Sequence, residues 1–188
     1  MSAPGDTVRT FVALVLDDEM RRKLEALASS LRPRMPGARW VRPEGVHLTL
    51  RFLGDTPPER IERLEADLSA AAAASSPAEV GVRGLDTFPG RGKPPRVLWV
   101  GLEVPASVDE LQAACEAAAV AAGFPAEERP FRAHLTLARF RERVLRPALP
   151  PTDLGTVRLH TLALVRSELR PGGAVYTPIA RFALGAGG

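Results

Sequence analysis

Two stretches of the chain share the same alternation of apolar and polar positions. Residues 46–54 read Val-His-Leu-Thr-Leu-Arg-Phe-Leu-Gly, and residues 133–140 read Ala-His-Leu-Thr-Leu-Ala-Arg-Phe. A period of two with frequent β-branched and aromatic residues predicts a strand for each stretch. Side chains two residues apart share a face of a strand, so one His and one Thr point to one side and the leucines to the other. If the two strands lie side by side, two imidazoles and two hydroxyls meet in one place.

The same pattern divides the rest of the chain into further strands and helices. Two aspartates at positions 17 and 18 suit the start of a helix, and Ser107 followed by Glu110 has the spacing of a capping box. Pro171-Gly172-Gly173 predicts a hairpin turn, and residues 185–188 predict a mobile tail. We expect helices at residues 17–31, 58–74 and 108–122, and further strands at residues 7–16, 38–41, 79–88, 96–104, 155–168 and 175–184.

This order of elements predicts an α+β fold with a rough internal duplication. An apolar strand, a helix and a His-x-Thr strand follow one another twice, which would bring the two motifs together about an approximate two-fold axis. We expect two antiparallel sheets that line a central cleft, with the helices on their outer faces. The length of 188 residues fits one bilobal domain that spans residues 1–188.

Composition places the chain among ordinary globular proteins. The apolar fraction is 45% and the charged fraction 25%. No apolar run reaches the length of a membrane span and the first residues lack a signal pattern, so we expect a cytoplasmic protein without membrane contact, and a monomer. The single cysteine, Cys115, allows no intrachain disulfide and no cysteine-based metal site, and is expected to be a small helix residue.

The basic residues of the chain are almost all arginines. Lys occurs only at positions 23 and 93, so 23 of the 25 basic residues are Arg, while the net charge is only +3. The abundance of Ala, Pro and Gly indicates that a genome-wide preference for Arg over Lys explains the number of arginines. Position is more informative, because a basic patch attracts polyanions and a guanidinium binds phosphate bidentately. Five arginines crowd the two His-x-Thr strands: Arg51, Arg132, Arg139, Arg141 and Arg143.

Each motif histidine taken alone has a plainer interpretation, as a core residue with satisfied hydrogen bonds. The chain holds three histidines and ten threonines, and composition alone would place Thr two positions after two of the histidines in roughly one sequence in a hundred. The matching leucines make a coincidence rarer, so the pair favours a shared site. His160 has no such Thr, and we assign it a structural or surface role.

The paired motif suits hydrolysis of a phosphodiester. One group must take a proton from water and another must protonate the departing oxygen, and His serves both roles near neutral pH. We expect His47 and His134 to be the acid and base, with the hydroxyls of Thr49 and Thr136 on the non-bridging oxygens. Arg139 and Arg51 are the predicted phosphate contacts. Tyr176 either hydrogen-bonds within the cleft or packs there; the pattern leaves both open. No metal or cofactor is required.

The two motifs resemble the paired His-x-Thr-x motifs of the 2H phosphoesterase superfamily. Residues 9–13, 46–54, 129–139 and 176–178 further resemble the RNA 2′,3′-cyclic phosphodiesterases, once called 2′–5′ RNA ligases. The resemblance implies that RNA ends with a 2′,3′-cyclic phosphate are opened to 2′-phosphomonoesters without a metal. It also implies that the first histidine, His47, donates a proton and the second, His134, accepts one.

Two other functions remain open at this point. The same fold could act on a small cyclic nucleotide or a 2′–5′ linked oligonucleotide, which rates on RNA ends and on mononucleotides would separate. A module of another class would bind RNA ends through Arg and Thr without catalysis. It would show binding but no product.

Overall fold

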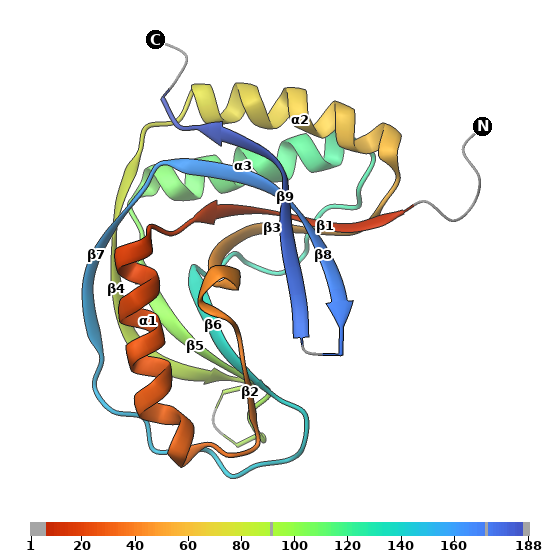
Figure 1. Ribbon diagram of the computed structural model, residues 1–188. Coiled ribbons are helices and arrows are strands. Elements are labelled where there is room, and N and C mark those ends of the chain that lie inside the picture. Colours follow the sequence, from red (N-terminus) through yellow and green to blue (C-terminus); the bar gives the residue numbers. More distant parts are fainter. Residues whose placement is uncertain (1–6, 91, 172, 186–188) are drawn as a thin grey trace.

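The strands of the protein form one antiparallel sheet that curls on itself (Figure 1). The computed structural model describes residues 7–90, 92–171 and 173–185. Its strands are β1 (Val8–Val15), β2 (Ala38–Trp40), β3 (His47–Thr56), β4 (Ala78–Phe88), β5 (Val97–Glu103), β6 (His134–Phe140), β7 (Asp153–Leu159), β8 (Thr161–Arg170) and β9 (Gly173–Ala183). The helices are α1 (Asp18–Leu31), α2 (Pro58–Ala73) and α3 (Ala106–Ala121), with short 3₁₀ turns η1 (Arg32–Arg34) and η2 (Pro43–Gly45).

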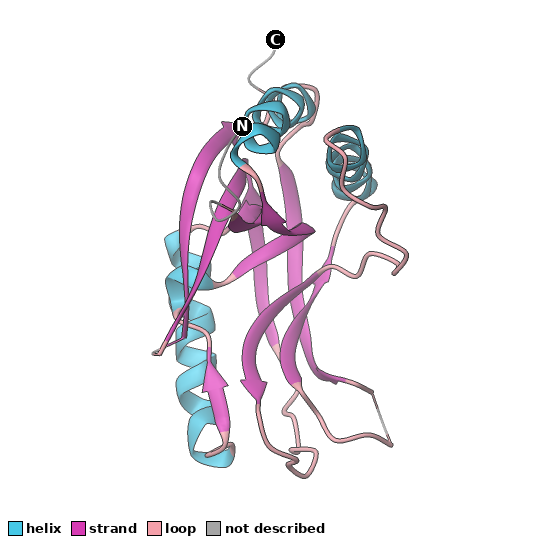
Figure 2. Ribbon diagram, turned by 90° about the vertical axis from the view of Figure 1, so that its right-hand side faces the viewer, coloured by secondary structure: helices cyan, strands magenta, loops and turns pink. Residues whose placement is uncertain are grey.

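The two halves of the sheet meet between β3 and β6. The strand order is β7-β4-β5-β6-β3-β1-β8-β9, and β2 pairs with the remaining part of the β6 edge. Leu48 pairs with Leu135 where β3 and β6 touch. Figure 2 shows the strands spreading from this region into two groups. The α+β prediction is therefore confirmed, with the refinement that the two expected sheets are continuous.

The core lies on the side of the sheet that carries the motif leucines. Leu48, Leu50, Leu135 and Leu137 are buried in one large apolar cluster that also contains the inner faces of the helices. Helices α2 and α3 pack together, α2 against β8 and β9 and α3 against β3, while α1 contacts β7 (Figure 1). The helices thus cover one face of the sheet and leave the opposite face, which carries the histidines, without a helical layer.

The ends of the helices follow the local sequence in one case and depart from it in another. Asp17 caps α1 as expected, because its Oδ1 accepts the Met20 amide at 2.7 Å. The expected cap at Ser107 is wrong. Helix α3 begins at Ala106, two residues before the expected start, and has no side-chain cap; the Pro105 carbonyl accepts the Val108 amide instead.

The C-terminal third differs from the expectation of one strand at residues 155–168. The chain breaks at His160 into β7, which pairs with β4, and β8, which pairs with β1, so it crosses from one half of the sheet to the other. The hairpin between β8 and β9 is confirmed by its register, although Gly172 lies outside the described residues. Of the expected tail, residues 186–188 also lie outside them, while the Gly185 amide donates to the Ala72 carbonyl at 3.1 Å.

The single cysteine is a small buried residue of a helix, as expected. Cys115 is buried within α3, and burial raises the pKa of its thiol to about 12. Among the described residues, no helix combines the length and the apolar character that crossing a membrane requires.

Candidate active site

The site begins with the register of β3 and β6. Antiparallel pairing of Leu48 with Leu135 places His47 across from Thr136 and Thr49 across from His134. All four side chains point away from the paired leucines, and all four are half-buried. We call this side of the sheet the histidine face. The two motifs, 87 positions apart in the chain, therefore share one small area related by an approximate two-fold axis.

Each motif strand carries a β-bulge at the same position. The register shifts between Val12 and Ala13 along β3, and between Leu98 and Trp99 along β6, and both strands then show the same order of buried and exposed residues. A bulge inserts one extra residue and reverses the alternation beyond it. As a result, Phe52 and Arg139 turn toward the histidine face, each five residues after its motif histidine.

Both histidines are held in the same tautomer by the backbone. The Nδ1 of His47 lies 2.7 Å from the Gly45 carbonyl oxygen, and the Nδ1 of His134 lies 2.7 Å from that of Arg132. A carbonyl can only accept, so each Nδ1 carries the hydrogen and donates it. The Nε2 of each ring is then the atom left for chemistry, because the other nitrogen is committed.

Aromatic rings enclose His47. Phe11 stacks on its imidazole with ring centroids 4.5 Å apart, and Tyr176 meets it edge-on at 5.2 Å. Gly45 permits this packing, since a β-carbon there would lie 3.1 Å from the Tyr176 ring. Burial lowers the pKa of His47 to about 4, and the charges of His134 and Arg139 act in the same direction. His47 is therefore neutral at pH 7 when no anion is bound.

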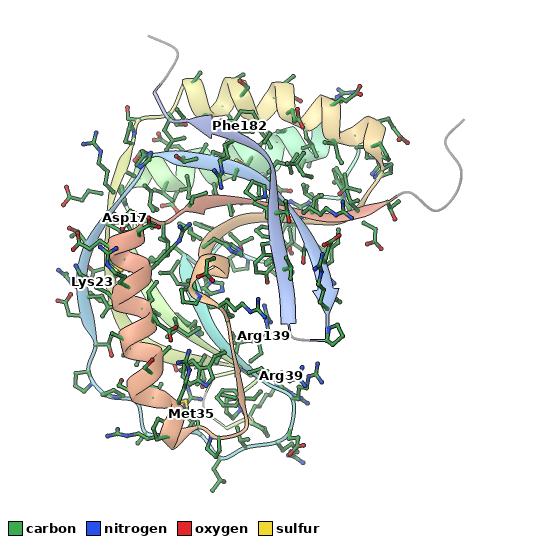
Figure 3. All side chains as sticks on the ribbon, viewed as in Figure 1. Asp17, Lys23, Met35, Arg39, Arg139 and Phe182 are labelled. Atoms are coloured by element: carbon green, nitrogen blue, oxygen red, sulfur yellow. The ribbon has the colours of Figure 1, made fainter. Side chains whose placement is uncertain are left out.

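His134 stands in a more open place. Its ring meets Trp99 edge-on at 5.9 Å, and Trp99 pairs with Thr136 across β5 and β6. The positive charge of Arg139 helps to lower the pKa of His47, the histidine of the other half. Figure 3 shows the Arg139 side chain extending toward the β8–β9 hairpin. The pair of histidines, the pair of threonines and one arginine thus come together on one face.

Arg51 does not join them, which corrects its expected role in substrate binding. It follows the bulge in β3 and turns to the core side, where it is only 7% exposed. Its guanidinium forms an ion pair with Glu116 of α3 and donates to the carbonyls of Phe52 and Pro125. These contacts fasten α3 and the following loop to β3, so Arg51 holds the fold together.

The remaining predicted residues also have clear places. Tyr176 lies on the histidine face and packs against Phe11 and His47. His160 is exposed at the break between β7 and β8, with its Nδ1 3.0 Å from the Thr161 hydroxyl. Sequence reasoning missed the aromatic residues Phe11, Trp99 and Phe52. The signal for Phe52 was its position, since it matches Arg139 when the two motifs are aligned.

The described part of the chain holds no group of three or more His, Cys, Asp and Glu side chains placed to bind a metal ion. The donors on the histidine face are two imidazoles, two hydroxyls and a guanidinium. This set binds an anion better than a cation, because the only metal ligands in it are the two imidazole Nε2 atoms.

Comparison with known proteins identifies the class to which this fold and site belong. The model of the family described as LigT like Phosphoesterase matches two consecutive segments, residues 14–99 and 100–176, and each segment contains one His-Leu-Thr-Leu motif. The chain belongs to this family of 2H phosphoesterases, as the resemblance of the motifs predicted.

Curated relatives narrow the comparison further. A protein of Methanothermobacter thermautotrophicus, named RNA 2′,3′-cyclic phosphodiesterase, is 32% identical over 94% of this chain and 99% of its own length. A protein of the same name from Thermus thermophilus is 34% identical over 94% of this chain and 90% of its own length.

Solved structures share the whole fold. TT0787 of Thermus thermophilus superposes with a TM-score of 0.82 at 34% identity and covers 94% of this chain and 98% of its own. Escherichia coli LigT in complex with 3′-AMP superposes with a TM-score of 0.80 at 27% identity and covers 95% of this chain and 99% of its own.

Proposed function

We propose that this protein hydrolyses 2′,3′-cyclic phosphate ends of RNA to 2′-phosphomonoesters, with two histidines and without a metal. The observation that carries the proposal is the antiparallel register about Leu48 and Leu135, which brings His47 and His134 to one face with both Nδ1 atoms committed to the backbone. The names of the curated relatives and the nucleotide in the Escherichia coli LigT complex support the choice of substrate.

The reaction needs one proton taken and one given. In this proposal, the Nε2 of His134 accepts a proton from water, whose oxygen attacks phosphorus while the bond from phosphorus to O3′ breaks. The Nε2 of His47 donates its proton to O3′, which leaves as a hydroxyl, and the phosphate stays on O2′. The resemblance of the motifs to the superfamily gives this assignment of donor and acceptor.

Binding of the substrate anion would prepare His47 for its role. In the free protein, burial lowers the pKa of His47 to about 4, and the charges of His134 and Arg139 act in the same direction. A bound phosphate adds negative charge among these groups, so the pKa of His47 rises when substrate enters. His47 then holds its proton only while the phosphate is in place, and a buried imidazolium gives that proton readily to the leaving oxygen.

The other groups on the histidine face fit the rest of the substrate. Thr49 and Thr136 can donate hydroxyl hydrogens to the non-bridging oxygens, whose charge grows as water attacks. Arg139 adds a guanidinium beside them. Phe52 is 51% exposed on the same face and offers an apolar surface on which a nucleobase can stack.

The proposal is tested with a short RNA that ends in a 2′,3′-cyclic phosphate. Turnover is followed in EDTA by phosphorus NMR, which distinguishes 2′-monoesters from 3′-monoesters. We expect complete conversion to the 2′-monoester at a rate unchanged by EDTA. Binding of the RNA without any product, formation of the 3′-monoester, or loss of activity in EDTA would each contradict the proposal.

A further inference from the structure

The histidine face continues beyond the catalytic groups into a pair of arginines. Arg39 in β2 is directly opposite Arg139 in β6, so both side chains lie on the same face. Figure 3 shows both extending to the side of the β8–β9 hairpin. Both are exposed. The face therefore carries two guanidinium groups next to each other at its β2 end.

This pair is unfavourable in the absence of a ligand. Like charges directly opposite one another on antiparallel strands destabilise a sheet. Some other exposed arginines of the described chain have carboxylate partners, such as Arg83 with Glu103 at 2.8 Å and Arg129 with Glu127 at 2.9 Å. Within the described residues, no ion pair or side-chain hydrogen bond involves Arg39 or Arg139. An anion that lies between them would relieve the repulsion and gain two bidentate partners.

The two arginines differ in their distance from the histidines. Arg139 belongs to the motif strand β6 itself, whereas Arg39 belongs to the neighbouring strand β2. Arg139 follows Thr136 by three residues, about 10 Å along an extended strand, and Arg39 lies one strand further to the side. Arg139 can thus reach the reacting phosphate and its neighbour, while Arg39 faces only a group beyond the reacting phosphate.

We infer that Arg39 and Arg139 form a second phosphate subsite, which takes the phosphate on the 5′ oxygen of the nucleotide whose cyclic phosphate is opened. This inference rests on the proposed function. The chemistry of the substrate selects that phosphate, because an RNA chain that ends in a 2′,3′-cyclic phosphate continues only through its 5′ oxygen. The subsite makes the protein prefer an RNA end over a bare cyclic nucleoside phosphate.

Two substrates that differ by one phosphate test the subsite. Adenosine 2′,3′-cyclic phosphate lacks the 5′-phosphate that 5′-phosphoadenosine 2′,3′-cyclic phosphate carries, and kcat/KM is measured for both. We expect the wild-type protein to prefer the second substrate. Arg39→Gln should lower kcat/KM for 5′-phosphoadenosine 2′,3′-cyclic phosphate about tenfold and change kcat/KM for adenosine 2′,3′-cyclic phosphate less than twofold. The dependence of kcat/KM on salt should become shallower only for the substrate with the 5′-phosphate.

A matched variant controls for the loss of one positive charge. Arg63 is exposed on α2, away from the histidine face, and Arg63→Gln should leave both substrates unchanged. Arg39→Lys, which keeps the charge but not the planar fork, should recover part of the preference. Equal loss on both substrates in Arg39→Gln, or no loss on either, would overturn the inference.

The same comparison separates the subsite from the activity. If the wild-type protein turns over neither these substrates nor the RNA that ends in a 2′,3′-cyclic phosphate, the proposed function fails. Calorimetric binding of adenosine 2′,5′-bisphosphate and of adenosine 2′-phosphate then still reports on the subsite. Arg39→Gln should weaken binding of adenosine 2′,5′-bisphosphate about tenfold and leave binding of adenosine 2′-phosphate unchanged. Equal affinities of wild type and variant for the bisphosphate would overturn the inference.

Discussion

Leu48 and Leu135 pair across the line where the two halves of the sheet meet, and each follows a motif histidine by one residue. This one backbone pairing sets the positions of both histidines and both threonines, since a slip of one residue would turn the His and Thr of one strand to the core side. The leucines themselves are fully buried. The packing of the core and the geometry of the site therefore depend on the same contact.

Stability should depend on pH through His47. Its pKa is about 4 in the folded protein and about 6.5 when unfolded, so the unfolded chain binds more protons between these values. Stability is then lost as pH falls through this window. We expect the wild-type free energy of unfolding to fall about 3 kcal/mol further than that of His47→Gln between pH 7 and pH 4. Denaturation at several pH values measures this, with His160→Gln as the control that keeps the wild-type slope. Parallel curves for wild type and His47→Gln would contradict the account.

Tyr176 should hold the pKa of His47 low. Its ring covers the imidazole edge-on, so Tyr176→Ala admits water and should raise the pKa of His47 toward 6.5. Tyr176→Phe keeps the ring and should leave the pKa near 4. A titration of the imidazole signals by NMR compares the two variants. A low pKa retained in Tyr176→Ala would show that the burial comes from elsewhere.

Arg51 should matter for stability rather than for catalysis. Arg51→Met leaves Glu116 without its buried cation, and we expect a loss of about 3 kcal/mol in the free energy of unfolding. At a temperature where the variant is still folded, its kcat on a cyclic phosphate should equal that of wild type. Arg63→Met on the exposed side of α2 is the matched control and should change neither quantity. A selective loss of kcat in folded Arg51→Met would show that Arg51 takes part in catalysis after all.

Phe52 should contribute to binding of the nucleoside. Base stacking on an aromatic ring contributes about 1–3 kcal/mol, so Phe52→Ala should raise KM roughly tenfold or more while stability changes little. Phe52→Tyr keeps a stacking surface and should remain close to wild type. Steady-state kinetics on adenosine 2′,3′-cyclic phosphate gives both constants. An unchanged KM in Phe52→Ala would show that the Phe52 ring does not contribute to nucleoside binding.

The sequence predicted the strands that carry the chemistry, but not which arginine accompanies them. Simple alternation places Arg51 with His47 and Thr49, and places Arg139 with the leucines. The bulges reverse both assignments, because the extra residue in each strand appears only once β1 and β5 are paired with them. A bulge depends on contacts distant in the chain, so a period counted along one strand cannot locate it.

The break at His160 has a similar cause. Residues 156–168 contain neither Gly nor Pro, so no local signal marks a break and the stretch predicts one strand. The chain instead leaves β4 and joins β1, and only the arrangement of the two halves requires that crossing. The repeated His-Leu-Thr-Leu motif could be recognised in the sequence because it is short and identical in the two halves. The pairing partners of each strand are distant in the chain, so the sequence of one strand does not reveal them.

The central claim is that two histidines act together on one phosphate, and single substitutions test it most directly. Turnover of an RNA 2′,3′-cyclic phosphate is measured for wild type, His47→Gln and His134→Gln, with circular dichroism to show that all are folded and His160→Gln as the control. We expect each motif variant to lose at least about a hundredfold in kcat, and the control to lose nothing. Wild-type turnover in a folded His47→Gln or His134→Gln protein would contradict the account.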